Sequence, residues 1–255
     1  MVRLWQLPTL VAGVSLVFPL KVKVDYKTIR AELDGLDDDL VFGPQLGPYH
    51  NGKWNRIGLV APSGDPHRTY PRPDEQNQRT DVLKALPSIE KIFDLFEGPV
   101  RAASISRMEP GAVVKWHRDV RQSADLEYVR LHLPIVTSRE STMILAHQTT
   151  HLTAGHLWYG DFTFPHRVDN KSNEARIHVM FDVPARASLL AFFPDRFRRE
   201  TLRRKAARRL ATGMFDRWQR STAEGKQMEA QRAARAAAIA RGEELALTPP
   251  AVSTH

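Results

Sequence analysis

Cysteine is absent from the 255 residues of this chain, and so are long apolar runs. Without cysteine there are no disulfide bonds, thiolate metal sites or cysteine nucleophiles, so any metal must be held by histidine and carboxylate side chains. No stretch reaches the roughly 18 apolar residues of a membrane span. The apolar stretch from Leu10 to Leu20 resembles a secretory signal only faintly, because Pro19 interrupts it and alternation continues through Val22 and Val24. We expect a first β-strand there instead, and a cytoplasmic protein.

The positive charge of the chain is concentrated near its C-terminus. The net charge is +8, but residues 196–241 hold 14 Lys and Arg against four acidic residues, a local net charge of +10. From residue 194 onward the sequence is rich in Ala and Arg and is expected to be helical, and residues 226–245 are almost of low complexity. The hydrophobic fraction of 42% is enough for a sizeable core. We therefore divide the chain into a globular domain, residues 1–190, and a basic helical extension, residues 191–255.

Three roles are open for the basic extension. It could be a solvated helical hairpin packed on the globular domain, a helix pair for a partner or for a homodimer, or a contact for nucleic acid or anionic membrane. No base-reading motif and no aromatic side chains between the basic residues support the last role, so we expect no nucleic-acid partner.

Hydrophobic periodicity predicts a domain that is mainly β with flanking helices. Residues 26–36 and 81–96 have helical spacing, whereas residues 43–79 are rich in turn formers around one short strand. Residues 129–135 and 176–183 alternate strictly, with apolar side chains on one face and polar side chains on the other. Further strands are expected within 143–147 and 156–162. Several short strands with turns between them indicate a sandwich or a barrel whose polar interior holds a site.

Histidines mark the centre of the sequence as the candidate site. Seven of the ten histidines lie between His117 and His178, and this window opens on Trp116-His117-Arg118-Asp119. His117 and Asp119 leave the same face of an extended segment, and His166 follows on a turn bounded by proline. Two imidazoles and one carboxylate are the ligand set of a mononuclear iron(II) oxygenase, because they leave three metal positions open. The alternative is a solvated His and Asp in a turn.

Polar side chains on the two alternating strands are the next candidates. Arg176 could form a bidentate bond to a carboxylate, or an ordinary surface salt bridge. Arg130 and His132 share one strand face, which favours a role in the site over a solvated surface. Four more histidines are expected to be structural rather than ligands: His147, His151, His156 and His178.

This block resembles the aspartyl/asparaginyl β-hydroxylase family of 2-oxoglutarate- and iron(II)-dependent dioxygenases. The resemblance covers about 80 of the 255 residues, and it rests on the order and spacing of several motifs rather than on any one of them. The matching elements are Ser106-Arg107-Met108-Glu109-Pro110-Gly111 with Trp116-His117, Arg130-Leu131-His132-Leu133, and Gly155, Trp158, Phe164, His166 and Arg176.

The resemblance implies a cupin-like double-stranded β-helix, or jelly roll, with the C-terminal helices appended. It implies Fe(II), 2-oxoglutarate and O2 as cofactors and cosubstrates, and release of succinate and CO2. His117 and His166 would bind iron, with Asp119 as the carboxylate that bacterial free-amino-acid hydroxylases carry and the animal peptidyl-aspartate hydroxylases lack. Arg176 and Ser106 would hold the distal carboxylate of 2-oxoglutarate.

The resemblance assigns two more side chains and leaves the substrate open. Arg130 and His132 would contact the metal-chelating end of 2-oxoglutarate. Tyr128 stands where the animal enzymes carry an arginine that faces the substrate, so their substrate is not assumed. We expect hydroxylation of an unactivated C–H bond of a small amino acid that is free, carrier-bound or peptidyl. The alternative is a non-catalytic cupin that binds a metal or ligand and engages nucleic acid or a protein partner through its basic tail.

Overall fold

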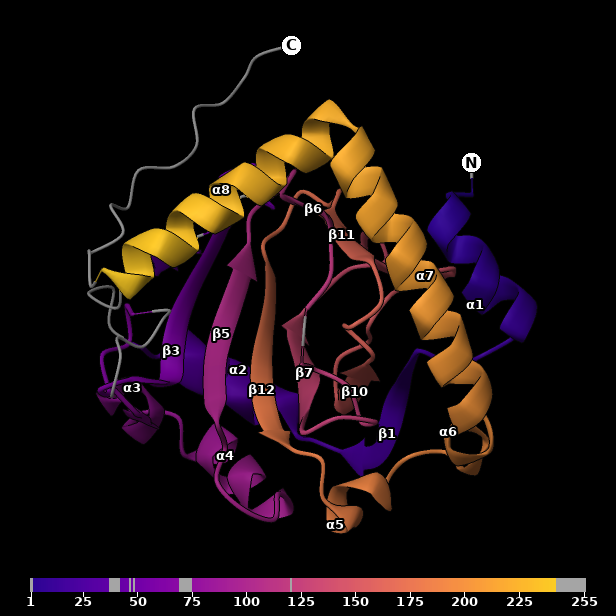
Figure 1. Cartoon of the computed structure of the whole chain (residues 1–255). Coiled ribbons are helices and arrows are strands. Elements are labelled where there is room, and N and C mark those ends of the chain that lie inside the picture. The colour runs from indigo at the N-terminus through magenta and orange to yellow at the C-terminus, as the bar shows by residue number, and fades with distance from the viewer. Residues whose placement is uncertain are drawn as a thin grey trace.

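In the computed structural model, described residues are 2–36, 42–45, 47, 49–68, 75–119 and 121–241. Within them, antiparallel strands form one sheet of eight strands and a second of four (Figure 1). The large sheet runs in the order β1 (Val17–Lys23), β10 (His156–Gly160), β7 (Tyr128–Val136), β12 (Arg176–Pro184), β5 (Ala102–Met108), β3 (Trp54–Pro62) and β2 (Gly43–Pro44), with β4 (Asn77–Arg79) also paired to β3. The small sheet runs in the order β6 (Val113–His117), β11 (His166–Asn170), β8 (Ser141–Leu145) and β9 (Gln148–Thr150).

The pairing of the last eight strands is nested. β8 pairs with β9, β7 with β10, β6 with β11, and β5 with β12. Two pairs lie in each sheet, so the nested hairpin is wound into two facing layers, which is the topology of a double-stranded β-helix or jelly roll. The predicted fold class is therefore confirmed, including the helices that follow the barrel.

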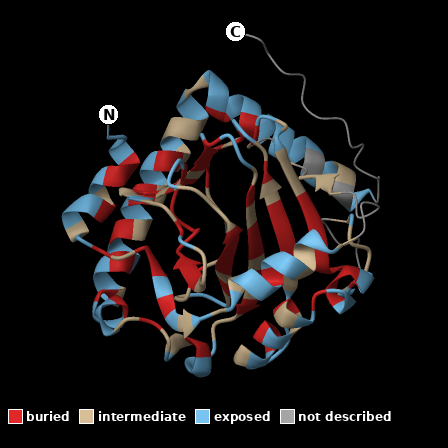
Figure 2. Cartoon of the chain, turned by 180° about the vertical axis from the view of Figure 1, so that it is seen from behind, coloured by how far each residue is buried: buried red, intermediate tan, exposed pale blue. Residues whose placement is uncertain are grey.

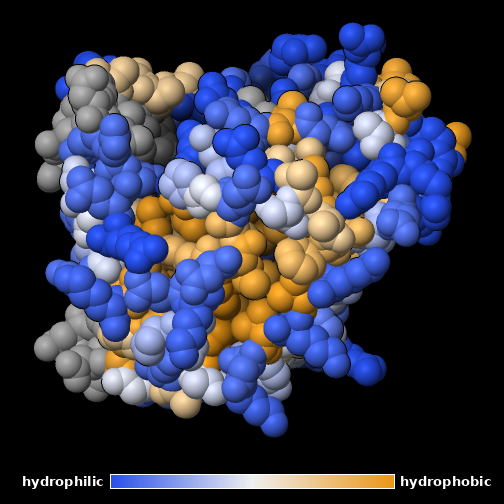
Figure 3. All heavy atoms as spheres, turned by 90° about the horizontal axis from the view of Figure 1, so that it is seen from below, coloured by the Kyte–Doolittle hydropathy of each residue, from blue (hydrophilic) through white to orange (hydrophobic). Residues whose placement is uncertain are grey.

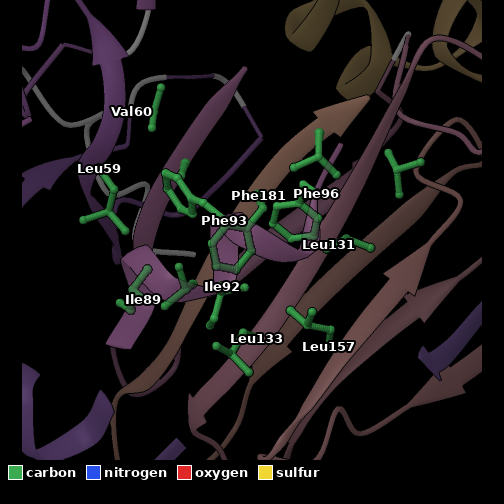
Figure 4. Close-up of a cluster of buried hydrophobic side chains, with 14 of the residues drawn as sticks. Leu59, Val60, Ile89, Ile92, Phe93, Phe96, Leu131, Leu133, Leu157 and Phe181 are labelled. Carbon is green, nitrogen blue, oxygen red and sulfur yellow. The ribbon is translucent and has the colours of Figure 1, made fainter. Parts of the chain in front are cut away.

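The long strands β7 and β12 of the large sheet have an apolar outer face and a more polar inner face. On β7, Leu131 and Leu133 lie on the outer face and are fully buried under the helices. Arg130 and His132 alternate with them and lie on the inner face. The outer face is covered by α2 (Tyr26–Asp34), α3 (Asp81–Lys84), α4 (Pro87–Glu90) and the short 3-10 helix η2 (Lys91–Leu95). Figure 4 shows aromatic and aliphatic side chains of this helical layer against those of the strands. Burial of one such large apolar side chain contributes about 1.5–3 kcal/mol.

The expected helix over 81–96 is interrupted, and this correction has a local cause. Pro87 has no N–H to donate and disfavours helical geometry at Leu86, whose φ of −125° and ψ of 61° leave the helix. The segment therefore divides into α3, α4 and η2. The helix predicted over 26–36 is confirmed as α2. It begins where Asp25 accepts hydrogen bonds from the amides of Lys27 and Thr28.

Near the N-terminus, the predicted first strand is confirmed as β1, but two short helices precede it. These are η1 (Leu4–Gln6) and α1 (Leu7–Ala12). α1 starts with Pro8 in its first turn and ends at Gly13, whose φ of 58° lies in the left-handed region that favours glycine. α1 lies beside the long C-terminal helix α7 (Thr201–Ser221), as Figure 1 shows.

The C-terminal helices pack against the barrel. After α5 (Ala187–Leu190) and α6 (Asp195–Arg199), α7 runs along one side of the barrel and α8 (Ala223–Ala240) crosses its upper end (Figure 1). Buried residues lie mainly on the strands, while the outward faces of the helices are exposed (Figure 2). From the side away from α8, hydrophobic side chains gather in the middle of the face among hydrophilic ones (Figure 3). In the described part of the chain no helix is both long and apolar enough to cross a membrane.

A buried ion pair holds α7 to the barrel. Arg204, which is completely buried, donates to both carboxylate oxygens of Asp125 at 3.1 and 2.8 Å. Burial raises the pKa of the Asp125 carboxyl, but the hydrogen bonds and charges of Arg204 and Arg208 outweigh it and hold that pKa below its ordinary value. Asp125 therefore stabilises the fold above the pKa of the unfolded chain, and this contribution is lost as the pH falls through the lower folded pKa.

We expect Asp125→Asn to be destabilised by about 3 kcal/mol at neutral pH, because Arg204 is left buried without its carboxylate. The difference from the wild type should shrink as the pH falls through the lowered folded pKa of Asp125, because the wild-type carboxyl is then itself being protonated. Thermal unfolding of the wild type and the variant between pH 7 and pH 3 measures the stability difference and its dependence on pH. Asp34→Asn, which alters an exposed pair with Arg30, is the matched control. A difference that stays constant over this pH range would contradict the assignment.

Candidate metal centre

The two predicted histidine ligands face each other across the small sheet. His117 ends β6, His166 begins β11, and the strand register pairs them directly. Their rings are 4.1 Å apart between centroids. Asp119 lies two residues beyond the end of β6, where its amide donates to the carbonyl of Phe162 at 2.9 Å. One possible ligand atom from each of the three side chains lies within 4.8 Å of the others, so the structure brings the predicted triad together.

Backbone carbonyls orient both imidazoles. Nδ1 of His117 lies 2.8 Å from the carbonyl oxygen of Lys115, and Nδ1 of His166 lies 3.0 Å from that of Phe164. A carbonyl only accepts, so each Nδ1 carries the proton and each Nε2 keeps a free lone pair. This arrangement is typical of histidine ligands, whose second nitrogen is fixed by a hydrogen bond.

The protonation states suit a divalent cation. Burial and the neighbouring His117 together lower the pKa of His166 to about 3, and burial also lowers the pKa of His117, so both rings are neutral near pH 7. Burial raises the pKa of Asp119, but the charges of Arg130, His166 and His117 outweigh this effect and keep the group a carboxylate. Two neutral imidazoles and one carboxylate form a donor set for a first-row divalent metal.

Arg130 lies beside the triad. Its Nη1 donates to Asp119 at 2.7 Å, while its other nitrogens form a bidentate pair with Asp182 of β12, also at 2.7 Å. Arg130 therefore fixes one oxygen of Asp119 from the inner face of the large sheet. Phe162 packs edge-on against His166 at 5.0 Å and lies 5.0 Å from His132, which places an apolar wall between the two histidines.

Arg176 is buried without a carboxylate partner among the described residues. It is 5% exposed at the start of β12, and its Nη1 approaches the sulfur of Met108 at 3.4 Å. Burial lowers its pKa to about 9, so the guanidinium is still charged at neutral pH. A buried cation is costly unless an anion balances it, so this position suits a ligand carboxylate.

Three further polar side chains share the inner face of the large sheet with Arg176. Ser106 of β5 accepts a hydrogen bond from Nε1 of Trp54 at 2.8 Å and pairs in register with His178. His132 and His178 are buried, and neither ring nitrogen of either residue has a hydrogen-bond partner among the described residues. Burial lowers the pKa of both imidazoles, and the charge of Arg176 adds to the effect, so both are neutral. His132 is also affected by His166, which connects this pocket with the triad.

Sequence reasoning missed one residue that contacts the site, Tyr49. His178 was expected to be structural rather than a ligand, and it lies outside the triad on the same strand face as Arg176, as the alternation of the strand predicts. Tyr49 stacks on His117 with 4.8 Å between centroids and 15° between planes. It comes from the turn-rich stretch and has no sequence signal. The other histidines that were expected to be structural also lie outside the triad: His147, His151 and His156.

Comparisons with known proteins identify the family of this chain. The sequence model of the aspartyl/asparaginyl β-hydroxylase family matches residues 23–186, so the chain belongs to this family. It is 26% identical over 187 residues to L-proline cis-4-hydroxylase of Rhizobium meliloti (strain 1021), covering 70% of this chain. The match spans only 62% of that relative's length.

The chain is also similar to solved structures, among them the following two. A prolyl-4-hydroxylase from Pseudomonas putida gives a TM-score of 0.42 at 14% identity, covering 72% of this chain and 100% of that chain. A 2OG-Fe(II) oxygenase-family oxidoreductase from Burkholderia pseudomallei gives a TM-score of 0.41 at 15% identity, covering 61% of this chain and 78% of that one.

If Asp119 is a metal ligand, Asp119→Ala should weaken binding of Fe(II) by about tenfold or more, because the metal loses an anionic donor. Anaerobic titration with Fe(II) measures the affinity. Asp34→Ala, which removes an exposed carboxylate on α2, should bind Fe(II) like the wild type. Unchanged affinity in Asp119→Ala would remove the carboxylate from the ligand set and leave a two-histidine site.

Proposed function

We propose that this protein is an iron(II)- and 2-oxoglutarate-dependent hydroxylase of an amino acid. The observation that carries the proposal is the proximity of two complementary features. The triad of His117, Asp119 and His166 offers a metal three donors, and the connected pocket holds Arg176, a buried cation for which the described residues offer no carboxylate.

The donor set fits iron(II), because two imidazoles and one carboxylate on one side leave three coordination positions for ligands. Iron bound there would supply the activation of O2 that couples hydroxylation to the conversion of 2-oxoglutarate into succinate and CO2. The protein's own residues bind, orient and shield. His117 and His166 present Nε2, Arg130 orients Asp119, and Phe162 keeps water from the space between the triad and the pocket.

In this proposal the inner face of the large sheet holds 2-oxoglutarate. Arg176 takes the distal carboxylate through a bidentate bond, with the hydroxyl of Ser106 beside it. His132 lies between this end and the triad and contacts the chelating end together with Arg130. The two unpartnered ring nitrogens of His132 support a polar ligand, because a buried polar group without a partner costs about 1–3 kcal/mol.

A free amino acid is the favoured substrate class. The relative with 26% identity is named an L-proline cis-4-hydroxylase, which supports a small free amino acid. Tyr128, at the position of the substrate-facing arginine of the animal enzymes, lies with its ring 4.4 Å from the guanidinium carbon of Arg101. Tyr128 itself therefore presents an uncharged phenol where the animal enzymes present an arginine, which disfavours a peptidyl aspartate.

A screen for succinate formation tests the function. The protein is incubated with Fe(II), ascorbate, 2-oxoglutarate and each of the twenty amino acids, and we expect L-proline or another small amino acid to stimulate succinate release. His166→Gln should abolish the signal, and His67→Gln, an exposed histidine far from the triad in sequence, is the control. Activity with peptides but not with free amino acids would assign a peptidyl substrate instead of a free amino acid. No succinate under any condition would favour a non-catalytic binding protein.

Arg176→Lys keeps a positive charge but loses the planar fork that binds a carboxylate with two hydrogen bonds. We expect the concentration of 2-oxoglutarate needed for half-maximal turnover to rise about tenfold to a hundredfold, with Fe(II) affinity little changed. Arg107→Lys on neighbouring β5, whose side chain is 41% exposed, is the matched control. An unchanged requirement for 2-oxoglutarate in Arg176→Lys would assign this arginine a structural role.

A further inference from the structure

We infer that helix α7, which lies beyond the residues matched by the family, positions the metal ligands of the barrel. The inference rests on the proposed metal centre and is independent of the substrate. α7 touches the two segments that carry the ligands at two places, through Arg208 and through Asp216.

The first contact joins the segment after Asp119 to the segment before His166. One nitrogen of Arg208, Nη2, donates to Ser123 and Asp125 at 2.8 Å each, and to Asp161 at 2.6 Å. Asp161 is completely buried, and the Arg208 side chain is 15% exposed. One guanidinium therefore fixes the distance between the two segments from outside the barrel.

Asp161 connects the Arg208 contact to Asp119 and His166 through the short turn at residues 161–164. Its carboxylate accepts a hydrogen bond from Thr163 at 2.5 Å, and its carbonyl accepts one from the amide of Phe164 at 3.1 Å. Two carbonyls of the turn then face the metal ligands. That of Phe162 accepts the amide of Asp119, and that of Phe164 accepts Nδ1 of His166. The turn at 161–164 thus orients one carboxylate and one imidazole at the same time.

The second contact is made by the residue that lies between two of the metal ligands in the sequence. Arg118, which separates His117 from Asp119, forms a bidentate pair with Asp216 of α7 at 3.1 and 3.2 Å. Both side chains are 31% exposed, so the pair contributes little to global stability. Its directional geometry, however, fixes the backbone at the point where the chain leaves β6 and turns toward Asp119.

α7 is itself held firmly enough to serve as a reference. Phe215 and Ala211 are fully buried, and Arg204 is bound to Asp125. The ring of Phe215 packs edge-on against Trp5 at 5.1 Å, which also meets Trp116 next to His117. Polar contacts from a rigid helix to both ligand segments are the arrangement expected of a support for metal ligands, whose loss typically weakens metal binding about tenfold to a hundredfold.

The experiment compares Co(II) affinity with stability in the full-length protein. Asp216→Asn removes the ion pair at a partly exposed position, so its midpoint of thermal unfolding should shift by at most about 3 °C. Its Co(II) affinity, read from the visible absorption of the bound ion, should fall about tenfold, whereas Asp216→Glu should keep most of the wild-type affinity and spectrum. Arg208→Gln should weaken Co(II) binding at least as much.

Arg203→Gln is the control. Arg203 lies on the same helix, is 60% exposed and donates to the carbonyl of Ala12 rather than to a ligand segment. Wild-type Co(II) affinity in Asp216→Asn, or an equal loss in Arg203→Gln, would overturn the role of α7 alone. Failure of the wild type to bind Co(II) would overturn the proposed metal centre as well.

Discussion

The pairing of His166 with His117 across β11 and β6 is the constraint on which the site depends. β11 is held on its other edge as well, where His166 pairs with Leu145 of β8. A register shift of one residue would turn an imidazole to the opposite face of the sheet, so the backbone hydrogen bonds of the strands decide the face on which both imidazoles lie. Asp119 lies beyond the strand, where its amide donates to the carbonyl of Phe162 and Arg130 donates to its carboxylate.

The two faces of the large sheet have opposite energetic roles. The outer face buries the aliphatic and aromatic side chains that stabilise the fold, such as Leu131 and Phe181. The inner face buries Arg176, His132 and His178, for which the described residues supply few hydrogen bonds. Such groups destabilise a protein that has no ligand, and the apolar layer offsets this cost. The same alternation of residues along each strand therefore builds both the core and the binding pocket.

Much of the barrel could be predicted from the sequence, because strict alternation over residues 129–135 and 176–183 permits few other structures. The pair of His117 and Asp119 was predictable for a similar reason, since one residue separates them, whereas His166 was predicted from its place on a later turn bounded by proline. The interruption of the helix at Pro87 was missed because broken and straight helices share one apolar spacing. Tyr49 was missed because only the folded chain brings it to the site.

The packing of the basic tail was foreseen as one of three roles, but a run of arginines gives no sign that Arg204 is fully buried. The expectations for residues 242–255 lie outside the described residues.

The nested pairing of the strands also orders the assembly of the protein in time. β8 and β9 are neighbours in sequence, whereas Arg176 and Met108, at the ends of the outermost pair, are 68 residues apart. Local pairs close before distant ones, so the barrel is expected to close from β8–β9 outward. α7 leaves the ribosome after every strand of the barrel. A nascent chain can therefore contain all three metal ligands while Arg208 and Asp216 are still being synthesised, and the centre reaches its final geometry only when the last third of the chain has been released.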